Sequence, residues 1–299
     1  MGEWCNKGLS LYHLGRYYES IDCCNKAIQI NPSFAGAYLN KGLALQGLGF
    51  LEEAINCYDG AIRLNSEYKI NDELSLYAWN SKGTCYNKAI KYREAIECYD
   101  NAIKINPTFA DSLNNKAECL SKMSCLGEAY DYIENAYMSN PEDIFILSNK
   151  GFSLECIGEF EDAIKYYDRA LRTDPLFPSA WFSKGSCLRK LHQYVEAIAC
   201  FDNAARFNSS YEDRSYSNKG LCLWNIERYE EALDSFNKAI KINEKLPEAW
   251  LNKASLEKTL GHKRDALQSV LQFFCICSIK KIDDLKLSTY ARRILQRIS

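Results

Sequence analysis

Residues 144–177 read IFILSNKGFSLECIGEFEDAIKYYDRALRTDPLF, and this stretch is the most regular copy of a 34-residue unit that recurs along the chain. In each half of the unit, residues suited to pack against a neighbouring helix are three or four positions apart, so they fall on one face of a helix. They are Leu147, Lys150, Gly151 and Leu154 in the first half and Ala163, Tyr167 and Ala170 in the second. Gly158 between the halves suits a left-handed turn, and Pro175 stops the second pattern. The unit therefore predicts two amphipathic helices joined by a tight turn.

Eight copies of the unit follow one another, and we number the positions of each copy from 1 to 34. The copies begin at residues 1, 35, 76, 110, 144, 178, 213 and 247. Seven residues, 69–75, are inserted before the third copy, where Asn71-Asp72 is suited to cap a helix that starts about one turn early. A fixed period of this length predicts one all-α stack of helix pairs over residues 1–276.

The C-terminal residues 277–299 depart from the repeat. Asp283-Asp284 is suited to cap a last helix, LKLSTYARRILQRI, whose apolar side we expect to cover the open end of the stack. A helix that lies on a membrane surface or binds a partner is the alternative.

Composition and charge disfavour several functions. The formal net charge of −2 and pI of about 6.0 leave no positive field for nucleic acid or an anionic membrane. No apolar run approaches the roughly 18 residues that a membrane span needs, and residues 1–10 have neither the basic start nor the apolar core typical of a signal sequence. We expect a cytoplasmic protein.

The fourteen cysteines follow the repeat rather than a redox or metal motif. Four of them, Cys85, Cys119, Cys187 and Cys222, share position 10, and Cys23, Cys57, Cys98 and Cys200 share position 23. Cysteines with a structural period are expected to pack as small apolar residues. No Cys-x-x-Cys, phosphate-binding loop or catalytic triad is found, so we expect no enzyme activity, no metal and no cofactor.

Trp4, Gly8, Ala27 and Pro32, with their counterparts in the other copies, resemble the tetratricopeptide repeat signature. The resemblance implies a right-handed superhelical solenoid of antiparallel helix pairs, whose first helices line a concave groove that usually holds a peptide. One departure is that position 7, usually leucine, is lysine in every copy. We expect the lysine stems to pack while the ammonium groups reach water.

Position 6 is expected to face the groove and is asparagine in six copies. These asparagines are Asn6, Asn40, Asn115, Asn149, Asn218 and Asn252. An amide both donates and accepts, so a row of amides at one height is suited to pair with the backbone of an extended ligand. The alternative is that these asparagines only reflect the family consensus, in which asparagine is common at this position.

Apolar and charged residues at groove positions suggest what such a ligand carries. The proposed apolar contacts are Phe145, Phe152, Phe182 and Trp224, and the proposed basic contacts are Lys88, Lys122, Arg189 and Lys190. They favour a mildly acidic peptide with apolar anchors. Packing between helices, self-association and a solvated face without preference are the alternatives.

The family's clamp for the C-terminal carboxylate of chaperones is not expected, because it needs Lys at position 5 and Asn at position 9, which no copy has. The sequence therefore predicts a non-catalytic scaffold that binds an extended segment of a partner protein. The alternative is a self-associating structural repeat protein whose groove is filled by its own chain or by a second copy.

Overall fold

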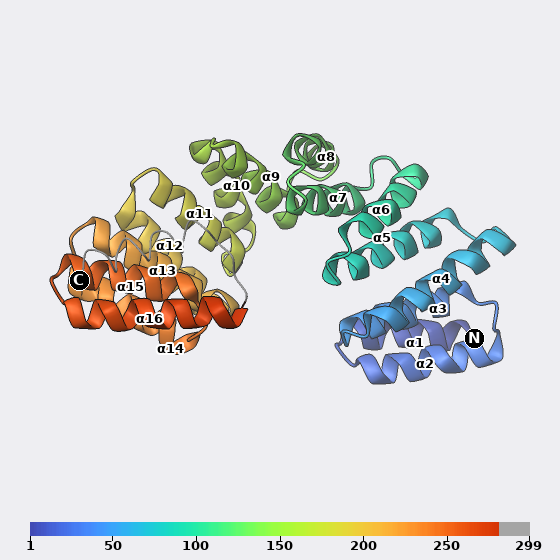
Figure 1. Cartoon of the computed structure of the whole chain (residues 1–299). Coiled ribbons are helices and arrows are strands. Elements are labelled where there is room, and N and C mark those ends of the chain that lie inside the picture. The colour runs from blue at the N-terminus through green and yellow to red at the C-terminus, as the bar shows by residue number, and fades with distance from the viewer. Residues whose placement is uncertain (281–299) are drawn as a thin grey trace. The chain divides into compact units, whose positions relative to one another are not determined.

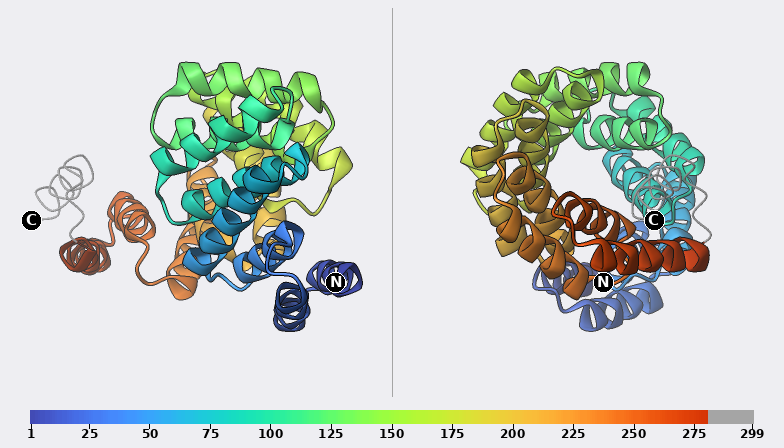
Figure 2. Two further views of the ribbon diagram at one scale, coloured as in Figure 1. Left: turned by 90° about the vertical axis from the view of Figure 1, so that its right-hand side faces the viewer. Right: turned by 60° about the vertical axis from the view of Figure 1, so that its left-hand side comes forward.

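The computed structural model describes residues 1–280, which form sixteen α-helices and one short 3-10 helix, without any strand among them (Figure 1). Within each unit, consecutive helices pack as antiparallel pairs, and neighbouring pairs of the same unit contact each other (Figures 1 and 2). The predicted all-α fold of helix pairs is confirmed. The chain divides into two compact units, Met1–Ser153 and a second that begins at Leu154.

The first unit contains four helix pairs and most of a further helix. They are α1 (Gly2–His13), α2 (Tyr17–Ile30), α3 (Ala35–Gly47), α4 (Leu51–Tyr68), α5 (Asp72–Lys88), α6 (Tyr92–Ile105), α7 (Ala110–Lys122), α8 (Leu126–Ser139) and α9 (Ile144–Ile157). The boundary between the units falls within α9.

The second unit continues the same alternation of helices. Its elements are α10 (Phe160–Thr173), α11 (Pro178–Lys190), α12 (Tyr194–Phe207), the 3-10 helix η1 (Ser209–Tyr211), α13 (Glu212–Asn225), α14 (Tyr229–Ile242), α15 (Pro247–Thr259) and α16 (Lys263–Lys280). Helix α16 continues past residue 276, where the repeats were predicted to end. The predicted last helix near residues 285–298 lies outside the described residues.

Positions 8 and 24 lock the two helices of a pair together. A Cβ added at Gly83 would lie 2.5 Å from the ring of Tyr99, so only glycine leaves room for that ring. In the α7–α8 pair the same two positions hold Ala117 and Ile133, which are both buried in one cluster. A larger residue at position 8 is thus matched by a narrower one at position 24.

The insertion at residues 69–75 lengthens α4. Ser66 stands at position 32, where four other repeats have proline, and without that stop the helix continues to Tyr68. Its C-cap is Lys69, whose φ is +48°. Asn71 Oδ1 then accepts a hydrogen bond of 2.8 Å from Glu73 N and caps α5. The predicted early start of this helix is confirmed.

The periodic cysteines pack in the core as expected, and all fourteen are free thiols. Cys85, Cys119 and Cys222 are fully buried within three separate clusters of apolar side chains. Burial raises the pKa of the Cys85 thiol to about 11, so it is protonated at neutral pH.

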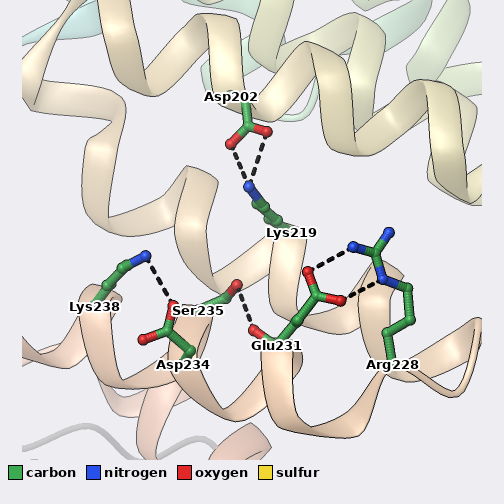
Figure 3. A network of polar contacts seen from close by, with 7 residues as sticks. All are labelled: Asp202, Lys219, Arg228, Glu231, Asp234, Ser235 and Lys238. Carbon is green, nitrogen blue, oxygen red and sulfur yellow. Dashed lines mark hydrogen bonds and ion pairs between the residues drawn. The ribbon is translucent and has the colours of Figure 1, made fainter.

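The expectation that the position-7 lysines reach water is wrong for five of them. Their ammonium groups bind carboxylates at position 25 of the preceding repeat, with N–O distances of 2.5 to 2.8 Å. The pairs are Lys82–Asp59, Lys116–Asp100, Lys150–Glu134, Lys184–Asp168 and Lys219–Asp202. Figure 3 shows Lys219 pointing from α13 toward Asp202 on α12. These pairs link neighbouring repeats along one edge of the helices.

Within residues 1–280, no helix is both long enough and apolar enough to cross a membrane.

Candidate functional site

Two of the predicted position-6 amides, Asn115 on α7 and Asn149 on α9, lie half-buried in the first unit. Each donates one hydrogen bond to an asparagine at position 5 of the preceding repeat. Asn115 Nδ2 lies 3.2 Å from Asn80 Oδ1, and Asn149 Nδ2 lies 2.9 Å from Asn114 Oδ1. The bonds fix the two amides, while their Oδ1 atoms accept no hydrogen bond from any described residue.

Asn40 is placed differently from Asn115 and Asn149. It is 8% exposed, and its Nδ2 donates to Cys5 O at 3.3 Å and Cys5 Sγ at 3.1 Å. Position 5 is a cysteine here and offers no amide oxygen, so the Asn40 side chain packs between α3 and α1. We therefore treat Asn40 as a packing residue.

The remaining position-6 asparagines are spread over both units. Asn6 is exposed on α1, and Asn252 is half-buried on α15. Asn218 donates to Arg214 O within its own helix at 2.9 Å. The structure thus gathers Asn115 and Asn149 on neighbouring first helices of the first unit.

A cleft of about 410 Å³, which we call the amide cleft, lies over α5, α7 and the start of α9. It is lined by Asn80, Asp111, Asn114, Asn115, Asp143, Phe145 and Ile146. Of the predicted contacts, it brings together Asn115 and Phe145, whose side chain is 57% exposed.

A second cleft of about 230 Å³, which we call the phenylalanine cleft, lies between α7 and α9. It is lined by Ala117, Glu118, Ser121, Lys122, Asn149, Phe152 and Ser153. The predicted contacts Lys122, Asn149 and Phe152 meet here. Lys122 is already paired, because its Nζ lies 2.6 Å from Glu118 Oε1.

The second unit has its own cleft of about 420 Å³ over α11, α13 and α15. Its lining includes Phe182 and Asn218 together with Arg214, Asp213 and Glu248. Phe182 also packs on the core, with its ring centroid 5.6 Å from that of Phe201.

Other predicted contacts lie away from these clefts. Trp224 packs against the buried cluster that contains Leu223 and Phe236. Its position therefore agrees with packing between helices, the alternative to a ligand contact. Lys88 and Lys190 are exposed at the ends of α5 and α11, and Arg189 is half-buried.

The charge of the amide cleft is opposite to the predicted basic excess. Asp111 and Asp143 line it, and none of its lining residues is lysine or arginine. Burial, and then the neighbouring Asp143, raise the pKa of Asp111. Among residues 1–280, no group of three or more His, Cys, Asp or Glu side chains is placed to hold a metal ion.

Comparison with known families places the chain. Models of the tetratricopeptide repeat match residues 3–34, 35–68, 76–109, 98–131, 157–213 and 214–246. The chain belongs to the tetratricopeptide repeat family. No curated protein matches it by sequence.

Solved structures show the same fold at low sequence identity. A chain of the APC/C hetero-tetramer Cut9–Hcn1 superposes with a TM-score of 0.71 at 16% identity, over 96% of this chain and 54% of that one. A tetratricopeptide repeat protein from Parabacteroides merdae ATCC 43184 gives 0.64 at 14% identity, over 87% and 98% of the two chains. Pseudomonas aeruginosa pilF gives 0.62 at 17% identity, over 74% and 99%. The chain thus spans about half the length of the Cut9–Hcn1 chain it matches.

Proposed function

We propose that the surface formed by α5, α7 and α9 in the first unit binds an extended segment of a partner protein. The observation that carries the proposal is the placement of Asn115 and Asn149. They stand one repeat apart, and each lines a cleft beside an aromatic side chain, Phe145 or Phe152. Tetratricopeptide repeat proteins are typically non-catalytic scaffolds for protein interactions, which supports this class of function.

The hydrogen bonds already made by Asn115 and Asn149 prepare them for a ligand. Because one amide hydrogen of each is held by Asn80 or Asn114, the side chains are oriented before binding. Less entropy is then lost when a peptide pairs with the remaining hydrogen and the Oδ1 atom. The two amides thereby offer one acceptor and one donor each.

Two amides alone bind too weakly for a stable complex. A net gain of ~1 kcal/mol per hydrogen bond is small against an association cost on the order of 4 to 15 kcal/mol. The exposed rings of Phe145 and Phe152 supply apolar surface, which contributes about 25 cal/mol per Å² buried. We therefore expect a segment with apolar side chains on either side of its paired backbone.

The proposal is tested with peptides of nine residues selected from a random display library against the full chain. Affinity is then measured by fluorescence polarisation for the parent chain and for the Asn115→Ala/Asn149→Ala variant. Loss of at least one ligand hydrogen bond of ~1 kcal/mol from each amide predicts binding that is weaker by about 30-fold or more. Failure to select any peptide, or unchanged affinity in the variant, would contradict the proposal.

Asn40→Ala is the matched control, because it removes the same type of bond to a preceding helix without touching either cleft. We expect it to lower stability and leave peptide affinity unchanged. Light scattering of the peptide-free chain checks the alternative of self-association. Stable dimers combined with no peptide binding would favour that alternative.

A further inference from the structure

The amide cleft contains two carboxylates that differ in how they are held. Asp143 Oδ1 accepts hydrogen bonds from Phe145 N at 2.9 Å and Ile146 N at 3.0 Å, so this side chain is fixed at the start of α9. Asp111, in the first turn of α7, makes no hydrogen bond or ion pair with any described residue. A fixed carboxylate and an unpaired one therefore share a cleft that no cationic side chain lines.

Asp111, which has no ion pair within residues 1–280, differs from the carboxylate of the neighbouring cleft. In the adjacent phenylalanine cleft, Glu118 is neutralised by Lys122 at 2.6 Å. Partial desolvation in the cleft and the negative charge of Asp143 both raise the pKa of Asp111. A cation bound between the two carboxylates would relieve this repulsion.

Two asparagines that line the same cleft, Asn114 and Asn80, have side-chain N–H groups that donate to no residue among residues 1–280. Asn114 is only 6% exposed, and it lines the cleft. Its Oδ1 accepts from Asn149, but its Nδ2 donates to no described residue. Asn80 is similar: its Oδ1 accepts from Ser112 Oγ at 2.9 Å and from Asn115, while its Nδ2 has no partner among residues 1–280. These N–H groups can donate hydrogen bonds to carbonyl oxygens, such as those of a peptide backbone.

We propose that the amide cleft holds a lysine or arginine side chain of the bound segment, with its ammonium or guanidinium group between Asp111 and Asp143. The backbone carbonyl groups of the segment accept from the unused N–H groups of Asn80 and Asn114. The exposed Phe145 ring covers the aliphatic stem of the bound side chain. This inference rests on the proposed function and names the residue class that the first unit selects.

A bare metal ion fits the cleft less well than a basic side chain. The cleft offers two carboxylates, whereas a bound calcium ion takes about six to eight oxygen ligands, and the amide N–H groups would repel a metal ion. A side chain attached to a peptide backbone satisfies the carboxylates and the amide donors together. The inference also replaces the mildly acidic ligand expected from the sequence with a segment that is basic at this one position.

The test uses a library-selected nine-residue peptide and variants that carry lysine, glutamate or norleucine at each position in turn. Fluorescence polarisation at low salt should find one position at which lysine binds about tenfold or more tightly than norleucine, and glutamate binds worst. This preference should shrink at high salt, because a partly exposed ion pair is screened.

Two substitutions of Asp111 test whether the peptide's preference for lysine arises in the amide cleft. Asp111→Asn should remove the advantage of lysine over norleucine, and Asp111→Lys should make glutamate the preferred residue at the same position. Glu128→Gln, on the exposed face of α8, is the matched control and should change nothing. Circular dichroism verifies that each variant is folded, which is expected because Asp111 lies at the surface.

The outcomes separate the two proposals. If peptides bind through Asn115 and Asn149 but show no position that prefers a cation, the cationic site is wrong and the peptide-binding surface stands. A lysine preference that survives Asp111→Lys also contradicts the cleft assignment. If the library yields no peptide at all, both proposals fail.

Discussion

Lys219 binds Asp202 through both carboxylate oxygens, at 2.6 and 2.8 Å, and thereby ties α13 to the second helix of the preceding repeat (Figure 3). The same pair of positions carries an ion pair at four other repeat junctions. The first junction lacks the carboxylate, because position 25 there is Asn25. Lys41 correspondingly has no ion pair among the described residues.

Supplying the missing carboxylate should therefore stabilise the first unit. Asn25→Asp is expected to raise the free energy of unfolding by about 0.5 to 1 kcal/mol at low salt, with a smaller gain at high salt. Urea unfolding of the parent and variant measures the difference. In the Lys41→Met background the substitution should give no gain, and an equal gain there would show that the ion pair is not the cause.

The close contact between Gly83 and Tyr99 predicts the effect of one added methyl group. Gly83→Ala is expected to lower the free energy of unfolding by about 1 to 3 kcal/mol, because the new Cβ would overlap the buried ring. The higher helix propensity of alanine, about 1 kcal/mol, works in the opposite direction. Thermal and urea unfolding give the net sign.

Gly36→Ala is the control for helix propensity, since its added Cβ would have no neighbour closer than 3.8 Å. This substitution should be neutral or stabilising. Combining Gly83→Ala with Tyr99→Ile copies the natural pair Ala117 and Ile133 and should recover part of the lost stability. No recovery would contradict the proposed matching of the two positions.

Glu257 on α15 gives the second unit a pH-dependent stability. The residue is 5% exposed, and its carboxyl group accepts a hydrogen bond of 2.8 Å from Ser269 Oγ. The Lys253 ammonium group lies 3.6 Å from this carboxyl group, and the negative charge of Asp265 is nearby. Burial is the main cause that raises its pKa. The folded state therefore binds this proton more tightly than the unfolded state, whose value lies near about 4.3.

The contribution of Glu257 to stability is fully present below about pH 4.3 and is lost as the pH rises through its higher folded pKa. Glu257→Gln should remove this slope and raise the free energy of unfolding at pH 7.5. Urea unfolding at pH 4 and pH 7.5 measures both ends. A larger benefit at pH 4 than at pH 7.5 would show that the sign is wrong.

The fold was predictable because the same contacts between helices recur with the 34-residue period of the sequence. Small residues at position 8 and aromatic or branched residues at position 24 are visible in the sequence, and the structure pairs them as Gly83 with Tyr99. The ion pairs of the position-7 lysines do not follow from the pattern of a single repeat. Their partners belong to the preceding repeat, although the recurring carboxylates at position 25 were a signal in the sequence.

The candidate site was predictable only in part. Asn115 and Asn149 do line clefts, but Asn40 does not, because the residue at position 5 of the preceding repeat decides where the amide points. Asn115 and Asn149 donate to the side-chain amides of Asn80 and Asn114, which occupy position 5 of the preceding repeats. Position 5 before Asn40 is Cys5, and Asn40 packs inward against it. The acidic character of the amide cleft depends on a helix-capping Asp143 brought next to α7, which a charge count over one helix face does not reveal.

The most direct test of the account follows the side-chain amide resonances of the asparagines by NMR while a library-selected peptide is added. The resonances are assigned by single Asn→Gln substitutions. We predict that the NH₂ signals of Asn115, Asn149 and Asn114 shift with one common dissociation constant, while those of Asn40 remain unchanged. Shifts confined to asparagines outside α5, α7 and α9, with these three unaffected, would contradict the proposed binding surface.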